Sequence, residues 1–138
     1  MARNTIPVVF NGVSKEALAD AGITPGHLIE RTATGVKVNA TAKDASPQNM
    51  FAREDELQGK TINDAYVATN RVLFDIYQPG DEVNALIKIG DSTVAGVTKL
   101  ESAGNGTLQI ATTGKVIAIA LETVTGGASA LRCVVEIL

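Results

Sequence analysis

The stretch from Pro79 to Leu121 constrains the fold more than any other part of the chain, because short apolar runs alternate there with glycine-containing turns. In it Val83, Ala85 and Ile87 would lie on one face of an extended segment. That period of two is typical of a half-buried strand. The run 115–121 is apolar at nearly every position, which predicts a strand buried on both faces.

Turns and further alternating runs extend the predicted β structure over most of the chain. Residues 103–106 (Ala-Gly-Asn-Gly) tolerate positive φ and predict a tight hairpin turn. Residues 27–38 read as a second hairpin, and residues 72–77 and 131–138 alternate as strands do. We therefore expect a mainly β fold, a small antiparallel β-barrel or sandwich that is β-tulip-like or jelly-roll-like.

The N-terminal region has a different pattern. Residues 1–12 predict an extended arm, and residues 13–138 a single β-rich domain. Ser14 offers an N-cap for good helix formers up to Ala21, and Gly22 follows them. One short helix is therefore predicted over Ser14–Ala21.

Composition excludes several function classes. With a formal net charge of −3 and a pI near 5.1, the chain is not expected to bind nucleic acid. No apolar run reaches transmembrane length and no secretory signal is read, so no membrane partner is expected. The single cysteine, Cys133, allows no intrachain disulfide and fits a reducing cytoplasm.

No constellation of residues predicts catalysis, a cofactor or a metal. His27 is the one histidine, and it lacks the partners that metal binding or nucleophilic catalysis needs, so a structural or surface role is expected. The charged run Arg53–Glu56 does not have the spacing of an EF-hand loop and reads as a solvated face. Cys133 alternates with apolar residues and reads as a small core residue. The chain is expected not to be an enzyme.

An ordered series of segments carries a family resemblance that spans about residues 22–138. The segments are Ile23-Thr-Pro-Gly-His-Leu-Ile29, Met50-Phe-Ala-Arg-Glu54, Gly59-Lys-Thr-Ile-Asn-Asp-Ala-Tyr66, Pro79-Gly-Asp-Glu-Val83, Leu100-Glu-Ser-Ala-Gly-Asn-Gly-Thr-Leu108, Val116-Ile-Ala-Ile-Ala-Leu-Glu122 and Arg132-Cys-Val-Val-Glu-Ile137. Together they resemble the head decoration, or capsid cement, proteins of tailed bacteriophages.

The resemblance implies a non-enzymatic structural protein with no cofactor. Such a protein would be made in the host cytoplasm and would bind the outer capsid surface of the expanded head in the virion. It would bridge subunits of the major capsid protein. It would act as a homotrimer, or second as a homodimer.

Two apolar segments are predicted to contact the capsid or a neighbouring subunit. The arm is too short to bury its own apolar side chains, and its backbone groups require partners. Pairing with a strand of a neighbour would satisfy both needs, whereas the alternative is packing on the chain's own barrel. The predicted contact residues are Arg3, Ile6, Val8, Val9, Phe10, Met50 and Phe51.

The competing interpretation is a small carrier or ligand-binding barrel related to biotinyl-type domains. Such domains present a lysine at a hairpin tip. Here Lys115 follows Thr-Gly but leads into a predicted strand, so the lysine signal is missing.

Overall fold

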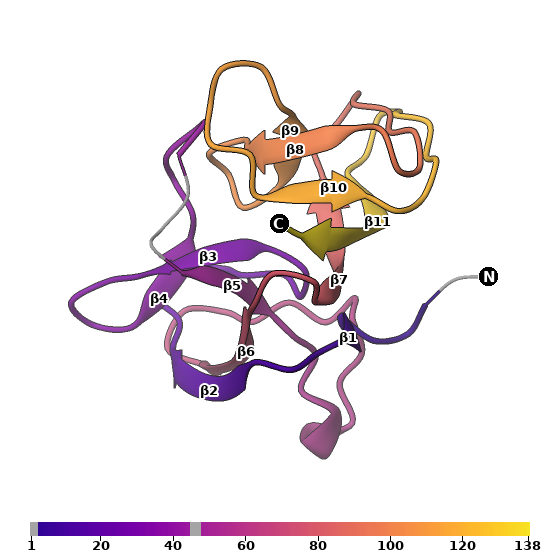
Figure 1. Cartoon of the computed structure of the whole chain (residues 1–138). Coiled ribbons are helices and arrows are strands. Elements are labelled where there is room, and N and C mark those ends of the chain that lie inside the picture. The colour runs from indigo at the N-terminus through magenta and orange to yellow at the C-terminus, as the bar shows by residue number, and fades with distance from the viewer. Residues whose placement is uncertain (1–2, 45–47) are drawn as a thin grey trace.

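The computed structural model describes residues 3–44 and 48–138, and nearly all regular structure in them is β-strand. Figure 1 shows two layers, one holding the strands β7 to β11 and the other the strands β2 to β6. In chain order the elements are β1 (Pro7–Val9), β2 (Val13–Leu18), β3 (Leu28–Arg31), β4 (Val36–Val38), β5 (Asn49–Ala52), the 3₁₀ helix η1 (Glu56–Gln58), β6 (Arg71–Tyr77), β7 (Glu82–Ile87), β8 (Lys99–Ser102), β9 (Leu108–Ile110), β10 (Ala118–Ala120) and β11 (Leu131–Ile137).

The C-terminal strands form a closed five-stranded barrel in the order β7-β11-β10-β8-β9. The ring closes where Ile87 of β7 pairs in parallel with Leu108 of β9. β1 joins the same edge of β7 at its beginning, through Pro7 opposite Val83. Closure leaves the barrel strands without a long free edge. Its interior is filled by aliphatic side chains with Cys133 among them.

The second layer is an antiparallel sheet in the order β2-β6-β5-β3-β4, and its end strands also meet, where Ala19, directly after β2, bridges Val36 of β4. Both of its faces are covered. On one face Leu28 and Phe51 join the core of the barrel, and on the other Ile29 and Met50 belong to a separate core. Because successive side chains of a strand point to opposite faces, neighbouring residues of β3 and β5 enter different cores.

The helix predicted over Ser14–Ala21 is wrong, because this segment contains the strand β2. All six residues from Val13 to Leu18 pair with β6, and Ala17 packs against the second core. The good helix formers of this run are overridden by pairing with a neighbouring strand, since helix propensity is a weak prior. Within the described residues the only helical turn is η1.

The predicted β class is confirmed, and so are both hairpins. β3 and β4 pair around the turn at 32–35, and β8 and β9 pair around a turn in which Gly104 and Gly106 have φ of 87° and 85°. The run 115–121 is predicted as a strand buried on both faces, but its strand β10 is shorter than this run. Ala118 and Ala120 are fully buried, whereas Ile119 is half-buried and Val116 is 37% exposed.

Candidate interaction surfaces

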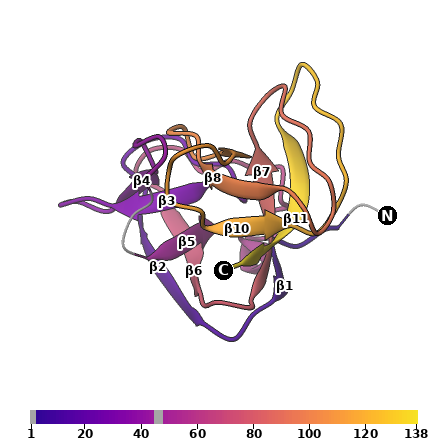
Figure 2. The ribbon, with the colours of Figure 1, turned by 45° about the horizontal axis from the view of Figure 1, so that its top comes forward.

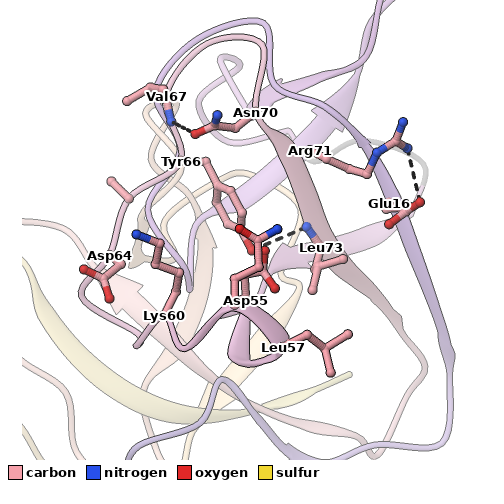
Figure 3. Close-up of a pocket in the computed structure, with 12 residues that line it drawn as sticks. Glu16, Asp55, Leu57, Lys60, Asp64, Tyr66, Val67, Asn70, Arg71 and Leu73 are labelled. Atoms are coloured by element: carbon pink, nitrogen blue, oxygen red, sulfur yellow. Dashed lines mark hydrogen bonds and ion pairs between the residues drawn. The ribbon is translucent and has the colours of Figure 1, made fainter.

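A groove of about 590 Å³ lies between η1, the chain around residues 60–70 and the outer face of β2 and β6 (Figure 3). We call it the η1 groove. It brings together segments that are far apart in the sequence. Its lining residues are Glu16, Asp55, Leu57, Gln58, Lys60, Asp64, Ala65, Tyr66, Val67, Asn70, Arg71 and Leu73.

Tyr66 forms the inner wall of the η1 groove. Its hydroxyl donates to the backbone carbonyl of Arg53 at 2.7 Å and accepts from the backbone N–H of Leu73 at 3.4 Å. Burial raises the pKa of Tyr66 to about 12, so the phenol stays protonated at neutral pH. Tyr66 therefore holds the wall of the groove in place by tying the segment after β5 to β6.

The rim of the η1 groove combines apolar and charged side chains. Leu57 is 89% exposed and Val67 is 62% exposed. Arg71 donates to Glu16 at 3.2 Å, in an ion pair that lies in solvent. Such exposed pairs contribute little to stability. The η1 groove thus offers a partner two apolar side chains beside charges of both signs.

The arm residues predicted to contact a neighbour lie on this chain's own barrel. Ile6 is fully buried in the barrel's core, and its backbone N–H donates to Glu54 at 3.0 Å. Phe10 packs edge-on against Tyr77, with ring centroids 5.2 Å apart. Ile6 and Phe10 therefore pack within the chain, which is the alternative left open by the sequence.

The remaining arm residues are more accessible. Arg3 is exposed, Val8 is half-buried, and Val9 at the end of β1 is 41% exposed. These three residues remain available to a partner, whereas Ile6 is not available.

Met50 and Phe51, which are also predicted to contact a partner, do not lie at the surface. Both are buried, Met50 in the second core and Phe51 in the barrel's core, where its ring meets Tyr77 at 5.6 Å. The sequence shows them next to a charged run, but β5 lies inside the sheet between β3 and β6. They hold the layers together and are not presented to a partner.

The charged run Arg53–Glu56 is only partly a solvated face. Arg53 pairs with Glu56 at 3.0 Å near the surface and lies 3.8 Å from the buried Asp75. Glu54 is buried and accepts the N–H of Ile6. Within residues 3–44 and 48–138, no group of His, Cys, Asp and Glu side chains is arranged to hold a metal ion.

Buried carboxylates attach the arm and β2 to the rest of the chain. Besides Glu54, Asp81 accepts from the backbone N–H of Asn11 at 3.1 Å, and Asp75 accepts from the hydroxyl of Ser14 at 2.6 Å. Local sequence patterns do not predict this role, since each pair joins residues that are far apart along the chain.

His27 and Cys133 are structural side chains. The Nδ1 atom of His27 accepts from the backbone N–H of Thr24 at 3.1 Å. Burial, with the nearby charge of Arg132, lowers the pKa of His27 to about 4, so the ring is neutral at pH 7. Cys133 is buried, and burial raises the pKa of its thiol above the ordinary value.

The described part of the chain contains no helix that is both long and apolar enough to cross a membrane.

Comparison with solved structures identifies a similar fold. The chain is similar to the head fiber gp8.5 N base in bacteriophage phi29, with a TM-score of 0.62 and 13% sequence identity. The match covers 93% of this chain and 95% of that one. At this identity the likeness shows the fold. No protein-family model matches the sequence, and no curated protein matches it significantly.

Proposed function

We propose that this chain is a non-enzymatic structural protein of a phage head. In this proposal it decorates the outer surface of the expanded capsid and bridges subunits of the major capsid protein. The observation that carries the proposal is the fold shared with the base of a phage head fiber over nearly the whole chain. The ordered series of sequence segments that resembles capsid cement proteins gives independent support.

The physical basis of the proposed role is linkage. A protein that binds only the expanded lattice stabilises that lattice by its difference in affinity for the two states. Many equivalent sites around the shell multiply the effect. The two cores, with the arm that Glu54 and Asp81 attach to the rest of the chain, supply the rigid body that such bridging needs. A homotrimer, or second a homodimer, would match a local symmetry axis of the shell.

The carrier interpretation gains no support from the position of Lys115. This residue lies between β9 and β10, which are not neighbours in the barrel because β8 stands between them. Lys115 is therefore not at the tip of a hairpin.

Co-sedimentation tests the proposed function. Purified protein is mixed with expanded phage heads that lack it, and with unexpanded heads as the control. We expect saturable, stoichiometric binding to the expanded heads only, and a higher melting temperature of the decorated heads. Absence of co-sedimentation with expanded heads at micromolar protein would contradict the proposal.

A further inference from the structure

Two asparagines of the chain are followed directly by glycine, Asn11 by Gly12 and Asn105 by Gly106. In such a pair the backbone nitrogen of the glycine can attack the side-chain amide carbon of the asparagine, because glycine has no side chain to hinder the approach. Whether the ring closes depends on how firmly the structure holds the nitrogen and the amide. The two sites differ in this respect.

At Asn105 hydrogen bonds hold both reacting groups. The N–H of Gly106 donates to the backbone carbonyl of Asn39 at 3.2 Å. The side-chain oxygen of Asn105 accepts from the backbone N–H of Thr107 at 3.1 Å and from the Thr107 hydroxyl at 2.5 Å. Gly106 is also buried. Ring closure at Asn105 therefore requires several hydrogen bonds to break first, each of which stabilises the fold.

At Asn11 the attacking nitrogen is free. Asn11 is exposed and lies in the connection between β1 and β2, and Figure 2 shows this indigo chain leaving β1 along the lower edge of the molecule. Within the described part of the chain, the N–H of Gly12 has no hydrogen-bond partner. The Cα of Gly12 packs closely on the carbonyl oxygen of Ile76, but ring closure takes place at the nitrogen and adds no atom to that carbon.

We propose that Asn11 is a site of spontaneous deamidation and that the carboxylate formed there loosens the N-terminal arm. The Gly12 nitrogen bonds to the side-chain carbon Cγ of Asn11 and loses its proton to water, and the side-chain nitrogen leaves as ammonia. Water then opens the cyclic imide at one of its two carbonyls. The products are aspartate and isoaspartate, and in isoaspartate the main chain runs through the former side chain.

The modification acts on the contact that attaches the arm to the turn before β7. Asn11 donates to one oxygen of Asp81 from its backbone N–H at 3.1 Å and from Nδ2 at 3.3 Å. Deamidation replaces the second donor by a carboxylate oxygen, so two negative charges face each other. Asp81 is 2% exposed, so water screens their repulsion poorly.

Isoaspartate adds a second disturbance. It lengthens the main chain by one carbon directly before Gly12, where the chain packs on Ile76. The arm keeps its other attachment, from the N–H of Ile6 to Glu54. We therefore expect the arm to loosen between these two points while the barrel and the second sheet stay folded.

Peptide mapping by mass spectrometry tests the chemical step. The purified protein is incubated at physiological temperature and mildly alkaline pH, and the exchange of NH₂ for OH is followed at both asparagines. A sample digested before incubation corrects for deamidation during the digest. We expect Asn11 to convert at least about tenfold faster than Asn105. Asn11→Gln, whose longer side chain closes a ring more slowly, is the matched control and should stay largely unmodified. Equal rates at the two asparagines, or a faster rate at Asn105, would overturn the proposal.

Amide hydrogen exchange tests the loosening of the arm. Asn11→Asp reproduces the aspartate product, and Asn11→Ala removes the donor without adding a charge. We expect exchange over residues 4–12 to be about tenfold faster in Asn11→Asp than in the wild type, with Asn11→Ala in between and residues 131–137 unchanged. Wild-type exchange rates in the arm of Asn11→Asp would show that the carboxylate does not loosen it. Faster exchange throughout the chain would also contradict the proposal, because the whole fold would then be destabilised.

Discussion

The C-terminal barrel and the second sheet each bury a carboxylate completely, but the pKa of that carboxylate is shifted in opposite directions in the two layers. In the barrel, Glu101 accepts from the Gln109 side chain at 2.9 Å and from the backbone N–H groups of Gly114 at 2.8 Å and Thr112 at 3.2 Å. Burial alone would raise the pKa of Glu101, but these hydrogen bonds outweigh it and bring the pKa below the ordinary value. The barrel therefore holds its carboxylate as the ion.

In the second sheet, Asp75 has fewer hydrogen-bond partners. One carboxylate oxygen accepts from the Ser14 hydroxyl, and the other has no hydrogen bond of normal geometry within the described residues. Burial raises the pKa of Asp75, and the Ser14 hydroxyl, the charge of Arg53 and the Tyr77 hydroxyl offset this rise only in part. The barrel thus satisfies its buried carboxylate with nearby hydrogen-bond donors, whereas the sheet keeps a poorly solvated carboxylate beside β2.

Removing an apolar side chain from the barrel should have the largest effect. Leu100 on β8 is fully buried in the core, so Leu100→Ala should lower the free energy of unfolding by about 2–5 kcal/mol. Urea denaturation measures the loss. Leu57→Ala, at an exposed position, serves as the control and should stay within about 0.5 kcal/mol of wild type. A loss at Leu100 no larger than that of the control would show that the barrel is not the main source of stability.

Adding a side chain at Gly12, where the arm contacts β6, should lower the free energy of unfolding by less than Leu100→Ala does. A Cβ atom on Gly12 would lie 1.8 Å from the carbonyl oxygen of Ile76, so the backbone must shift to accept it. Gly12→Ala should therefore destabilise the protein by about 1–3 kcal/mol in urea. Gly127→Ala is the matched control, because a Cβ atom there meets nothing within 4 Å. Equal stability of the two variants would mean that the crossing is readily deformed.

The sequence predicts the barrel better than the sheet. The turn glycines and the burial of Cys133 are local signals, and the structure contains both. The alternation in β7 correctly places Val83, Ala85 and Ile87 in one core, but the strand is buried on both faces and not on one. β2 was predicted as a helix because its residues favour one, and only pairing with the distant β6 makes it a strand. Met50 and Phe51 read as exposed because the run beside them is charged, while the elements that cover them come from elsewhere in the chain.

The surfaces were harder to predict than the fold. The η1 groove is assembled from segments that are remote in sequence. Composition along the chain shows where charge is absent, but not which uncharged segments end up side by side.

Acidification should lower the stability of the protein through protonation of His27. This residue lies where the sheet meets the barrel's β8–β9 hairpin at Gly106. The folded pKa of about 4 is below the ordinary 6.5, so the unfolded chain binds the proton more readily. The stability from this group is complete above pH 6.5 and is lost as the pH falls toward 4. We expect a fall in melting temperature of about 5 °C from this group over that range.

His27→Asn isolates this contribution, since asparagine keeps an acceptor for the N–H of Thr24 but cannot be protonated. The difference in melting temperature between the wild type and His27→Asn should shrink as the pH falls from 7 to 4. A difference that does not depend on pH would show that His27 does not titrate in this range.

The smallest expected effect is a gain in stability at Asp75, and it separates the sheet from the barrel most directly. Because the folded pKa of Asp75 is raised above the ordinary 3.8, the folded state favours the protonated form. The stability from this group is therefore present at low pH and is lost as the pH rises through the folded pKa. Asp75→Asn keeps an oxygen to accept from Ser14 and removes the buried charge, so the melting temperature at pH 7 should rise by about 2 °C. Glu101→Gln is the control in the barrel, and it should lower the melting temperature at pH 7, because the barrel stabilises that carboxylate as the ion. If both variants shifted the melting temperature in the same direction, the contrast between the two layers would not hold.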